Sequence, residues 1–505
     1  MKPPRTPRSS DTGTGTGKLS AGRGKGRVQD GKPRYQDDKG KKGGKSGGKP
    51  SGKPSGKFQG KPGGKPGFKP RGDKPEGVRP PRPLDPRRAA HRLVCAVLED
   101  HENLAELTGR IGPLARMEPA HRARAQRLAT ETLRNLDALD DMLAQHIDRM
   151  PAPPVQNVLR IAAYELAQGE AAHGVVNGAV THVSSMPRHN RAKGMANAVL
   201  RKLADQATDA WANRKPSRLP DWLREPLVMA WTDQTVTAFE AAHQRGAPLD
   251  LTPAKPELAE PLSKQLDAQI LPTGSLRIDR PVQVSTLPGF DAGSWWVQDA
   301  AAAIPARILD PKAGEKVLDL CAAPGGKTMQ LAAAGAQVTA VDISAARTER
   351  IAENLQRTGL RAKMITQDAF DMTDDGWDAI LLDAPCSATG TIRRHPDLPY
   401  AQDGSGISDL IDLQARMIDH ALSLLKPGGR LVYCTCSLIP DEGEVQVDEA
   451  LARHPGLTTD RDALTQPGID PAWITQEGGL RLRPDYWADQ GGMDGFYIAM
   501  LRKPA

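Results

Sequence analysis

Four of the five cysteines stand at the ends of short apolar runs that are typical of buried strands: Cys321, Cys386, Cys434 and Cys436. Ligands of α/β sheets bind outside the carboxyl ends of the strands, so these thiols are candidates for chemistry. A thiolate there could act as a nucleophile beside a bound cofactor. Three of the thiols together with His395 could instead hold a metal, although no paired C-x-x-C framework is present. Cys95 is typical of an inert core residue.

A glycine-rich turn follows the first expected strand, from Cys321 to Lys327. Its two adjacent glycines allow the backbone to approach a ligand closely, and the P-loop spacing is absent. Asp342 ends the second strand, where a carboxylate can accept hydrogen bonds from ribose hydroxyls. Asp368 follows the third strand and could lie beside an adenine. A solvated strand end explains any one carboxylate, but acids at successive strand ends favour a nucleoside-containing cofactor.

The elements that must position these residues alternate between strand and helix. The expected strands are Lys316–Leu320, Val338–Val341, Met364–Ile365, Ala379–Leu382 and Arg430–Cys434. Amphipathic stretches lie between them, the clearest being Ile407–Leu425, which Pro427 and two glycines end. Strands separated by helices predict an α/β domain with a mostly parallel, doubly wound sheet.

Composition divides the 505-residue chain unevenly. Residues 1–85 hold 23 basic and 7 acidic residues, whereas the remainder is net acidic. This first segment has almost no large apolar residues and repeats a lysine every four positions from Lys49 to Lys69. We therefore expect it to be a disordered tail. Such a tail could tether RNA through its phosphates, or it could only aid solubility. No run of about 18 apolar residues or secretory signal is present. With five cysteines in all, the chain fits a reducing, cytoplasmic compartment.

Two further regions precede the α/β domain. Residues 86–206 read as an all-α bundle, because Ala90, Leu93, Val94, Val97 and Leu98 share one helix face and four more helical stretches follow: Arg122 to Arg134, Val155 to Glu170, Val175 to Ser185 and Lys193 to Leu203. Residues 207–293 are expected to form a small α+β connecting module for RNA recognition, with strands near residues 248–251 and 276–278. Residues 294–505 complete the chain.

Several strings then resemble one family in the correct order: LDLCAAPGGKT, AVDIS, LLDAPCSATG, LKPGGRLVYCTCS and GGMDGFY. They resemble the Sun/Fmu/NOL1 group of RNA cytosine-5 methyltransferases, which use S-adenosylmethionine. Val175-Val176-Asn177 and the stretch from Met195 to Arg201 resemble the RNA-binding NusB domain. Together they look like the bacterial Sun/Fmu type. The resemblance implies a multidomain protein with a NusB-like bundle and a Rossmann-like methyltransferase domain. It also implies a monomer that acts on small-subunit ribosomal RNA, without metal or membrane.

The resemblance also implies roles for individual residues. Cys436 would be the nucleophile, Cys386 would assist product release, and Asp383 would hold the cytosine edge near the cofactor. The cofactor's methionine part would be wrapped by Cys321, Ala322, Ala323, Pro324, Gly325, Gly326 and Lys327. Asp342 would bind its ribose and Asp368 its adenine.

Some alternatives stay open at this point. Cys434 shares a strand face with Cys436, so spacing alone does not choose the attacking thiol. Arg393, Arg394 and His395 could contact RNA phosphate or lie in a solvated loop. The chain has Glu442-Gly443-Glu444 where the family often has Glu-Asn-Glu. The substrate could instead be tRNA, or the protein could be a non-catalytic RNA-binding assembly factor.

Overall fold

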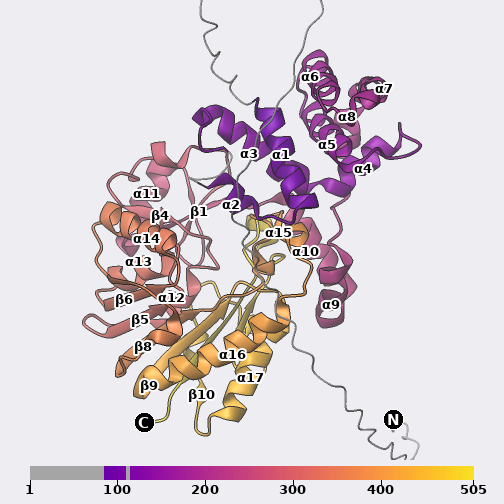
Figure 1. Ribbon diagram of the computed structural model, residues 1–505. Coiled ribbons are helices and arrows are strands. Elements are labelled where there is room, and N and C mark those ends of the chain that lie inside the picture. Colours follow the sequence, from indigo (N-terminus) through magenta and orange to yellow (C-terminus); the bar gives the residue numbers. More distant parts are fainter. Residues whose placement is uncertain (1–84, 110–113) are drawn as a thin grey trace, which may run out of the picture. The chain divides into compact units, whose positions relative to one another are not determined.

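The computed structural model describes residues 85–109 and 114–505 (Figure 1). The basic tail expected over residues 1–85 therefore lies, except for its last residue, outside the described part. Within that part, no helix is both long and apolar enough to cross a membrane.

The first described region is all-α, as predicted. Its helices are α1 (Pro86–Glu99), α2 (Leu104–Thr108), α3 (Pro119–Arg134), α4 (Leu136–Ala144), α5 (Pro153–Ala167), α6 (Ala172–Ser184), α7 (Lys193–Ala204) and α8 (Ala207–Ala212). Proline starts α1, α3 and α5, where its missing N–H is not needed. Helix α5 lies at the centre and packs against α1, α3, α4, α6, α7 and α8. The fully buried core of the bundle includes Leu93, Leu139 and Leu159.

The connecting region combines helices with a small antiparallel sheet. Its helices are α9 (Asp221–Trp231), α10 (Asp233–Arg245) and α11 (Ala259–Leu266). The strand order is β2 (Gln269–Ile270), β3 (Leu276–Ile278), β1 (Leu249–Pro253) and β4 (Trp295–Val297). Strand β4 lies just past residue 293. Its Trp295 is buried in the core of this sheet, whereas the adjacent Trp296 is buried with residues of the next domain.

The last region is the predicted α/β sheet. The strand order is β10 (Thr458–Thr459), β12 (Phe496–Arg502), β9 (Leu425–Thr435), β8 (Trp377–Asp383), β5 (Lys316–Leu320), β6 (Gln337–Asp342) and β7 (Lys363–Thr366), and β11 (Leu480–Leu482) pairs with β12. Strands β9, β8, β5, β6 and β7 are parallel, and β12 runs antiparallel to β9. The prediction of a mostly parallel sheet is confirmed.

Helices cover both faces of this sheet (Figure 1). They are α12 (Ile304–Leu309), α13 (Gly326–Ala333), α14 (Ala345–Thr358), α16 (Ile407–Leu424) and α17 (Glu444–Arg453). The short helix α15 (Leu398–Ala401) packs instead against α1. Successive strand residues point to opposite faces, so Leu318 packs with the α16 side and Val317 with the α12 side. The doubly wound arrangement follows, with β5 as the first strand and the chain winding outward on either side.

Candidate active site

A cavity of about 390 Å³ lies at the carboxyl ends of β5, β6, β8 and β9. Its volume falls within the range of small-molecule and cofactor sites. Seven of the sequence-predicted residues line it: Cys321, Ala323, Asp342, Asp368, Asp383, Cys386 and Cys436. The other predicted residues, Ala322, Pro324, Gly325, Gly326 and Lys327, belong to the turn beside the cavity and do not line it. The sheet therefore assembles one site from residues that are far apart in the sequence.

The glycine-rich turn takes its shape from backbone that bulkier residues cannot adopt. Gly325 has φ +97°, and a Cβ added there would lie 2.8 Å from a side-chain carbon of Ile351. Cys321 also has a positive φ, 60°. Helix α13 begins at Gly326, directly after this turn. Glycine is thus needed at position 325 for both conformation and close packing.

Asp342 joins the turn to the end of β6. Its Oδ2 accepts a hydrogen bond from the Ala323 N–H at 3.1 Å, and its Oδ1 accepts one from the Ser344 N–H at 2.9 Å. Arg347, whose side chain is about half exposed, forms an ion pair with it at 3.0 Å. These contacts fix the Asp342 side chain in the cavity wall, where its oxygens can accept hydrogen bonds from ribose hydroxyls.

The other side of the cavity has apolar walls with one carboxylate among them. Phe370 and Met417 line it, and Asp368 accepts a hydrogen bond from the Phe370 N–H at 3.0 Å. Ile343, also in the wall, is 64% exposed. Apolar walls together with the carboxylates of Asp342 and Asp368 fit a nucleoside cofactor such as S-adenosylmethionine.

A buried ion pair links the turn to the end of β8. Lys327 Nζ lies 2.7 Å from Asp383 Oδ2, and Cys434 Sγ lies 3.4 Å from Asp383 Oδ1. Burial acts to lower the pKa of Lys327, but the facing Asp383 outweighs it, so this pKa lies above its ordinary value. Burial raises the pKa of Cys434, which is fully buried and does not line the cavity. Of the two thiols on β9 and just after it, only Cys436 reaches the cavity.

The two remaining thiols face each other across the site. Cys386 Sγ and Cys436 Sγ are 3.6 Å apart. The hydrogen bond to Cys436 and burial both raise the pKa of Cys386, which therefore keeps its proton at neutral pH. Lys327 and Arg394 are both close enough to feel a charge on Cys436. A thiolate at Cys436 would thus lie near two cations and beside a thiol that can donate a proton.

The arginines after β8 are not equivalent. Arg393 has a side chain that is 1% exposed and is paired with Asp299 at 2.6 Å and Asp494 at 2.8 Å. Neither phosphate binding nor a solvated loop fits this buried residue. Arg394 is also paired with Asp494 but remains partly exposed.

Sequence reasoning missed a buried polar network beneath the thiols. Glu442 is fully buried and accepts hydrogen bonds from Ser387 and Ser437, the residues that follow the two cysteines. It also missed Asp319, whose pKa burial raises to about 7 although Thr328 donates a hydrogen bond to it at 2.5 Å. For Asp319, the sequence signal that could have indicated a buried functional acid is its position between Leu318 and Leu320, inside an otherwise apolar strand.

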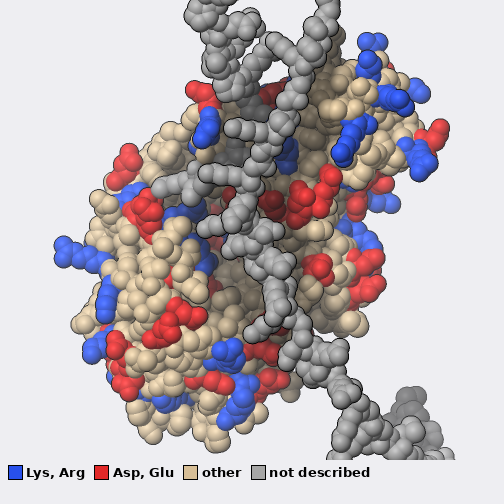
Figure 2. All heavy atoms as spheres, in the orientation of Figure 1, with Lys and Arg blue, Asp and Glu red and all other residues tan. Residues whose placement is uncertain are grey.

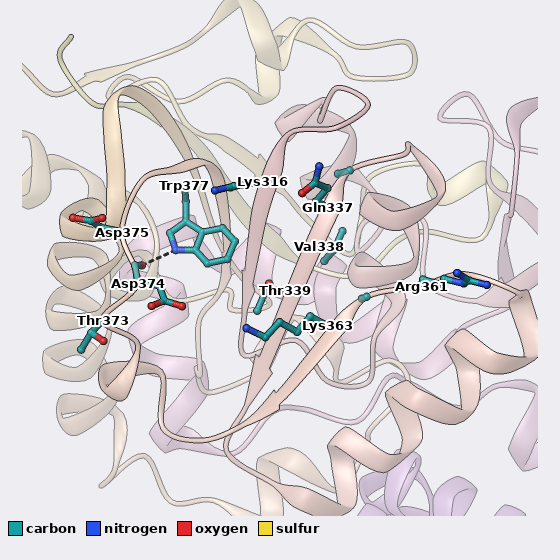
Figure 3. Close-up of a pocket in the computed structure, with 12 residues that line it drawn as sticks. Lys316, Gln337, Val338, Thr339, Arg361, Lys363, Thr373, Asp374, Asp375 and Trp377 are labelled. Atoms are coloured by element: carbon teal, nitrogen blue, oxygen red, sulfur yellow. Dashed lines mark hydrogen bonds between the residues drawn. The ribbon is translucent and has the colours of Figure 1, made fainter.

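A second hollow, of about 850 Å³, lies at the opposite end of the same strands (Figure 3). Lys316, Lys363 and Asp375 are among the residues that line it, and the Trp377 indole donates a hydrogen bond to the Asp374 carbonyl beside it. No cysteine lines this hollow, and its lining contains both cationic and acidic side chains. Among the described residues, moreover, no cluster of His, Cys, Asp and Glu is arranged to hold a metal ion. Cys386 and Cys436 line the cavity at the carboxyl ends instead.

Comparison with known proteins agrees with both parts of this architecture. The family model for 16S rRNA methyltransferase RsmB/F matches residues 306–502, and the NusB family model matches residues 84–205. A ribosomal RNA small subunit methyltransferase B from Sodalis glossinidius is 36% identical over 448 residues, which is 83% of this chain and 97% of the relative. The chain belongs to this family.

Other members of the RsmB/F family are equally similar. The relative from Pseudomonas syringae pv. tomato is 34% identical and covers 84% of this chain and 98% of its own. The relative from Erwinia tasmaniensis is 39% identical over 330 residues, which is 62% of this chain and 73% of the relative. The crystal structure of PH0851 has a TM-score of 0.63 at 23% identity over 83% of this chain and 99% of that chain, which shows the shared fold. The predicted enzyme class, a methyltransferase that uses S-adenosylmethionine to modify RNA, is confirmed.

Proposed function

We propose that this enzyme transfers a methyl group from S-adenosylmethionine to carbon 5 of a cytidine in small-subunit ribosomal RNA. The names of its relatives support ribosomal RNA as the substrate. Exposed cations on α7 and on the segment between α6 and α7 support RNA binding: Arg188, Arg191, Lys193, Arg201 and Lys202. Lys and Arg side chains gather over this part of the bundle (Figure 2). We place the enzyme in the cytoplasm as a monomer.

The reaction requires a nucleophile because carbon 5 of cytosine is too electron-poor to attack a methyl group unaided. The Cys436 thiolate forms a bond to carbon 6, and the electron pair of the 5,6 double bond then becomes available at carbon 5. Bound S-adenosylmethionine supplies the electrophilic methyl group. The Asp383 carboxyl group holds the cytosine edge, and Lys327, which pairs with it at 2.7 Å, keeps this group in place.

Release requires two bonds to break. Carbon 5 loses its proton, the double bond re-forms, and the bond between carbon 6 and Cys436 Sγ breaks. Cys386 lies 3.6 Å from that sulfur, within reach of the same face of the ring. Water takes the proton from carbon 5, and the Cys386 thiol, which is protonated, is placed to give its proton to the departing Cys436 sulfur.

The observation that carries this proposal is that Cys436, not Cys434, reaches the cavity and faces Cys386. The test compares Cys436→Ala with Cys434→Ala in methylation of small-subunit RNA by radiolabelled S-adenosylmethionine. We expect Cys436→Ala to lose at least 1,000-fold in rate while it still binds RNA, and Cys434→Ala to retain activity. Full turnover by Cys436→Ala would overturn the assignment.

The substrate is tested separately. Bisulfite sequencing of total RNA from cells with and without the protein should lose one protected cytidine in small-subunit ribosomal RNA. A loss confined to tRNA would overturn the ribosomal assignment but keep the reaction. No loss in any RNA would favour a non-catalytic role.

A further inference from the structure

A single buried carboxylate connects the two loops that carry the thiols. Glu442, in the short helix Pro440–Glu442, is fully buried. Its Oε1 accepts hydrogen bonds from the Ser387 N–H at 2.9 Å and from Gln414 Nε2 at 3.0 Å. Its Oε2 accepts hydrogen bonds from Ser387 Oγ at 2.5 Å and from Ser437 Oγ at 2.6 Å. Both oxygens are therefore saturated by donors.

These donors come from the residues next to the thiols. Ser387 follows Cys386 after β8, and Ser437 follows Cys436 after β9. Gln414, on α16, also donates a hydrogen bond to the Pro385 carbonyl at 2.8 Å, so the first loop is held from both sides. Glu442 thus joins the two loops from below. The loops also contact each other directly, since the Ser387 and Ser437 hydroxyls are 3.2 Å apart and the Leu438 N–H donates a hydrogen bond to Thr389 Oγ1 at 2.9 Å.

Burial of the Glu442 carboxyl group has a free-energy cost that an apolar side chain would not have in a purely structural role. Burying a carboxylate is unfavourable unless hydrogen bonds or a cation compensate it. In the part of the chain that the structure describes, Glu442 forms no ion pair, and its four hydrogen bonds provide the compensation. Charge-assisted bonds are short and directional, which makes them suited to fixing a distance.

We propose that Glu442 is a positioning residue that sets the separation of the Cys386 and Cys436 sulfurs and thereby controls release of the methylated RNA. This proposal rests on the proposed function for its kinetic consequence, but the thiol separation can be measured independently. Addition by Cys436 needs only one thiol, whereas elimination needs both at the correct distance. Loosening the carboxylate should therefore impair release more than addition.

Glu442→Gln is the direct test because it preserves volume. The new glutamine has an N–H donor where Glu442 has an acceptor, so it faces serine hydroxyls that themselves donate. The Ser437 hydroxyl already accepts a hydrogen bond from the Ile439 N–H at 3.0 Å, so it is poorly suited to accept another. We expect turnover to fall at least tenfold, with an unchanged KM for RNA. The fraction of enzyme covalently bound to RNA on denaturing gels should rise at least fivefold. Glu442→Asp, which retains the charge, should recover part of the turnover.

The separation itself is measured with phenylarsine oxide, which binds two neighbouring thiols and releases its oxygen as water. Wild-type enzyme should bind it with an affinity that is lost in Cys386→Ala and in Cys436→Ala, and Glu442→Gln should bind it at least tenfold more weakly. Glu165→Gln is the matched control, since Glu165 is a buried carboxylate of the helical bundle. It should lower thermal stability without changing arsenical affinity or adduct level.

The outcomes are separable. Unchanged arsenical affinity and adduct level in Glu442→Gln would overturn the positioning role, whatever the fate of the proposed reaction. Weaker arsenical affinity together with full activity of Cys436→Ala would retain the spacing role and overturn the reaction. If Glu442→Gln does not fold, Ser437→Ala removes one of the four hydrogen bonds and is measured in the same way, with smaller changes expected in the same direction.

Discussion

Cys386 Sγ lies 3.6 Å from Cys436 Sγ, although 50 positions separate the two residues in the chain. Neighbouring parallel strands β8 and β9 create this proximity, since Asp383 pairs with Cys434 and each thiol lies a few residues beyond its strand. Two thiols at this distance can act on the same carbon–sulfur bond.

Cys386→Ala should trap the enzyme on its RNA. Addition by Cys436 remains possible, whereas elimination loses its proton donor, so we expect at least tenfold more covalent complex than in wild type. Labelled RNA that stays with the protein on a denaturing gel measures it. Cys95→Ala, which alters a thiol of the helical bundle, should behave like wild type. An absence of covalent complex in Cys386→Ala would remove this residue from the release step.

Asp342→Asn should weaken cofactor binding. A hydrogen bond to a charged group contributes about 1.5–3 kcal/mol, so the Kd for S-adenosylmethionine should rise by roughly 10- to 150-fold. Isothermal titration calorimetry provides the measurement. Asp371→Asn changes an exposed carboxylate that does not line the cavity and should leave the Kd unchanged. Equal affinities for Asp342→Asn and wild type would contradict the ribose assignment.

His243 should make the protein less stable in acid. His243 is buried on α10, and its ring nitrogens have no hydrogen-bond partner among the described residues. Burial, and to a smaller extent the positive charge of Arg134, lowers its pKa to about 3. Below pH 6.5 the unfolded chain binds a proton that the folded chain does not, so the free energy of unfolding falls as pH decreases toward about 3.

His243→Leu should remove this contribution. Between pH 7.5 and pH 5 its free energy of unfolding should fall by about 2 kcal/mol less than that of wild type, as measured by urea denaturation. His121→Gln, at an exposed position of α3, should follow the wild-type pH profile. An identical loss in His243→Leu and wild type would show that His243 is protonated in the folded protein.

Periodicity was sufficient where an element is regular and locally determined. Strand β5 was predicted with the bounds that the structure has, and α16 ends one residue before its predicted end. Helix α4 was missed because its mixed sequence follows α3 after a single residue. Trp222 and Trp231 lie on one helix, α9, in which Pro226 is tolerated.

The site was predictable to the extent that strand ends determine it. Asp342, Asp383 and Cys436 could be placed at one edge because each follows a strand of the same sheet. The Glu442 network could not, because its partners Ser387 and Gln414 are 55 and 28 positions away and meet it only after α16 packs. Nor could Arg393 be recognised as buried, since Asp299 and Asp494 are distant in sequence.

Strand β4 has one more consequence. The indoles of Trp295 and Trp296 are adjacent in sequence but buried in two different cores. If one core unfolds, strand β4 loses its place, and the tryptophan buried in the other core is pulled out of it as well. The small antiparallel sheet and the large sheet should therefore lose their structure in one calorimetric transition. RNA that binds to the small sheet would consequently raise the melting temperature of the thiol-bearing domain as well.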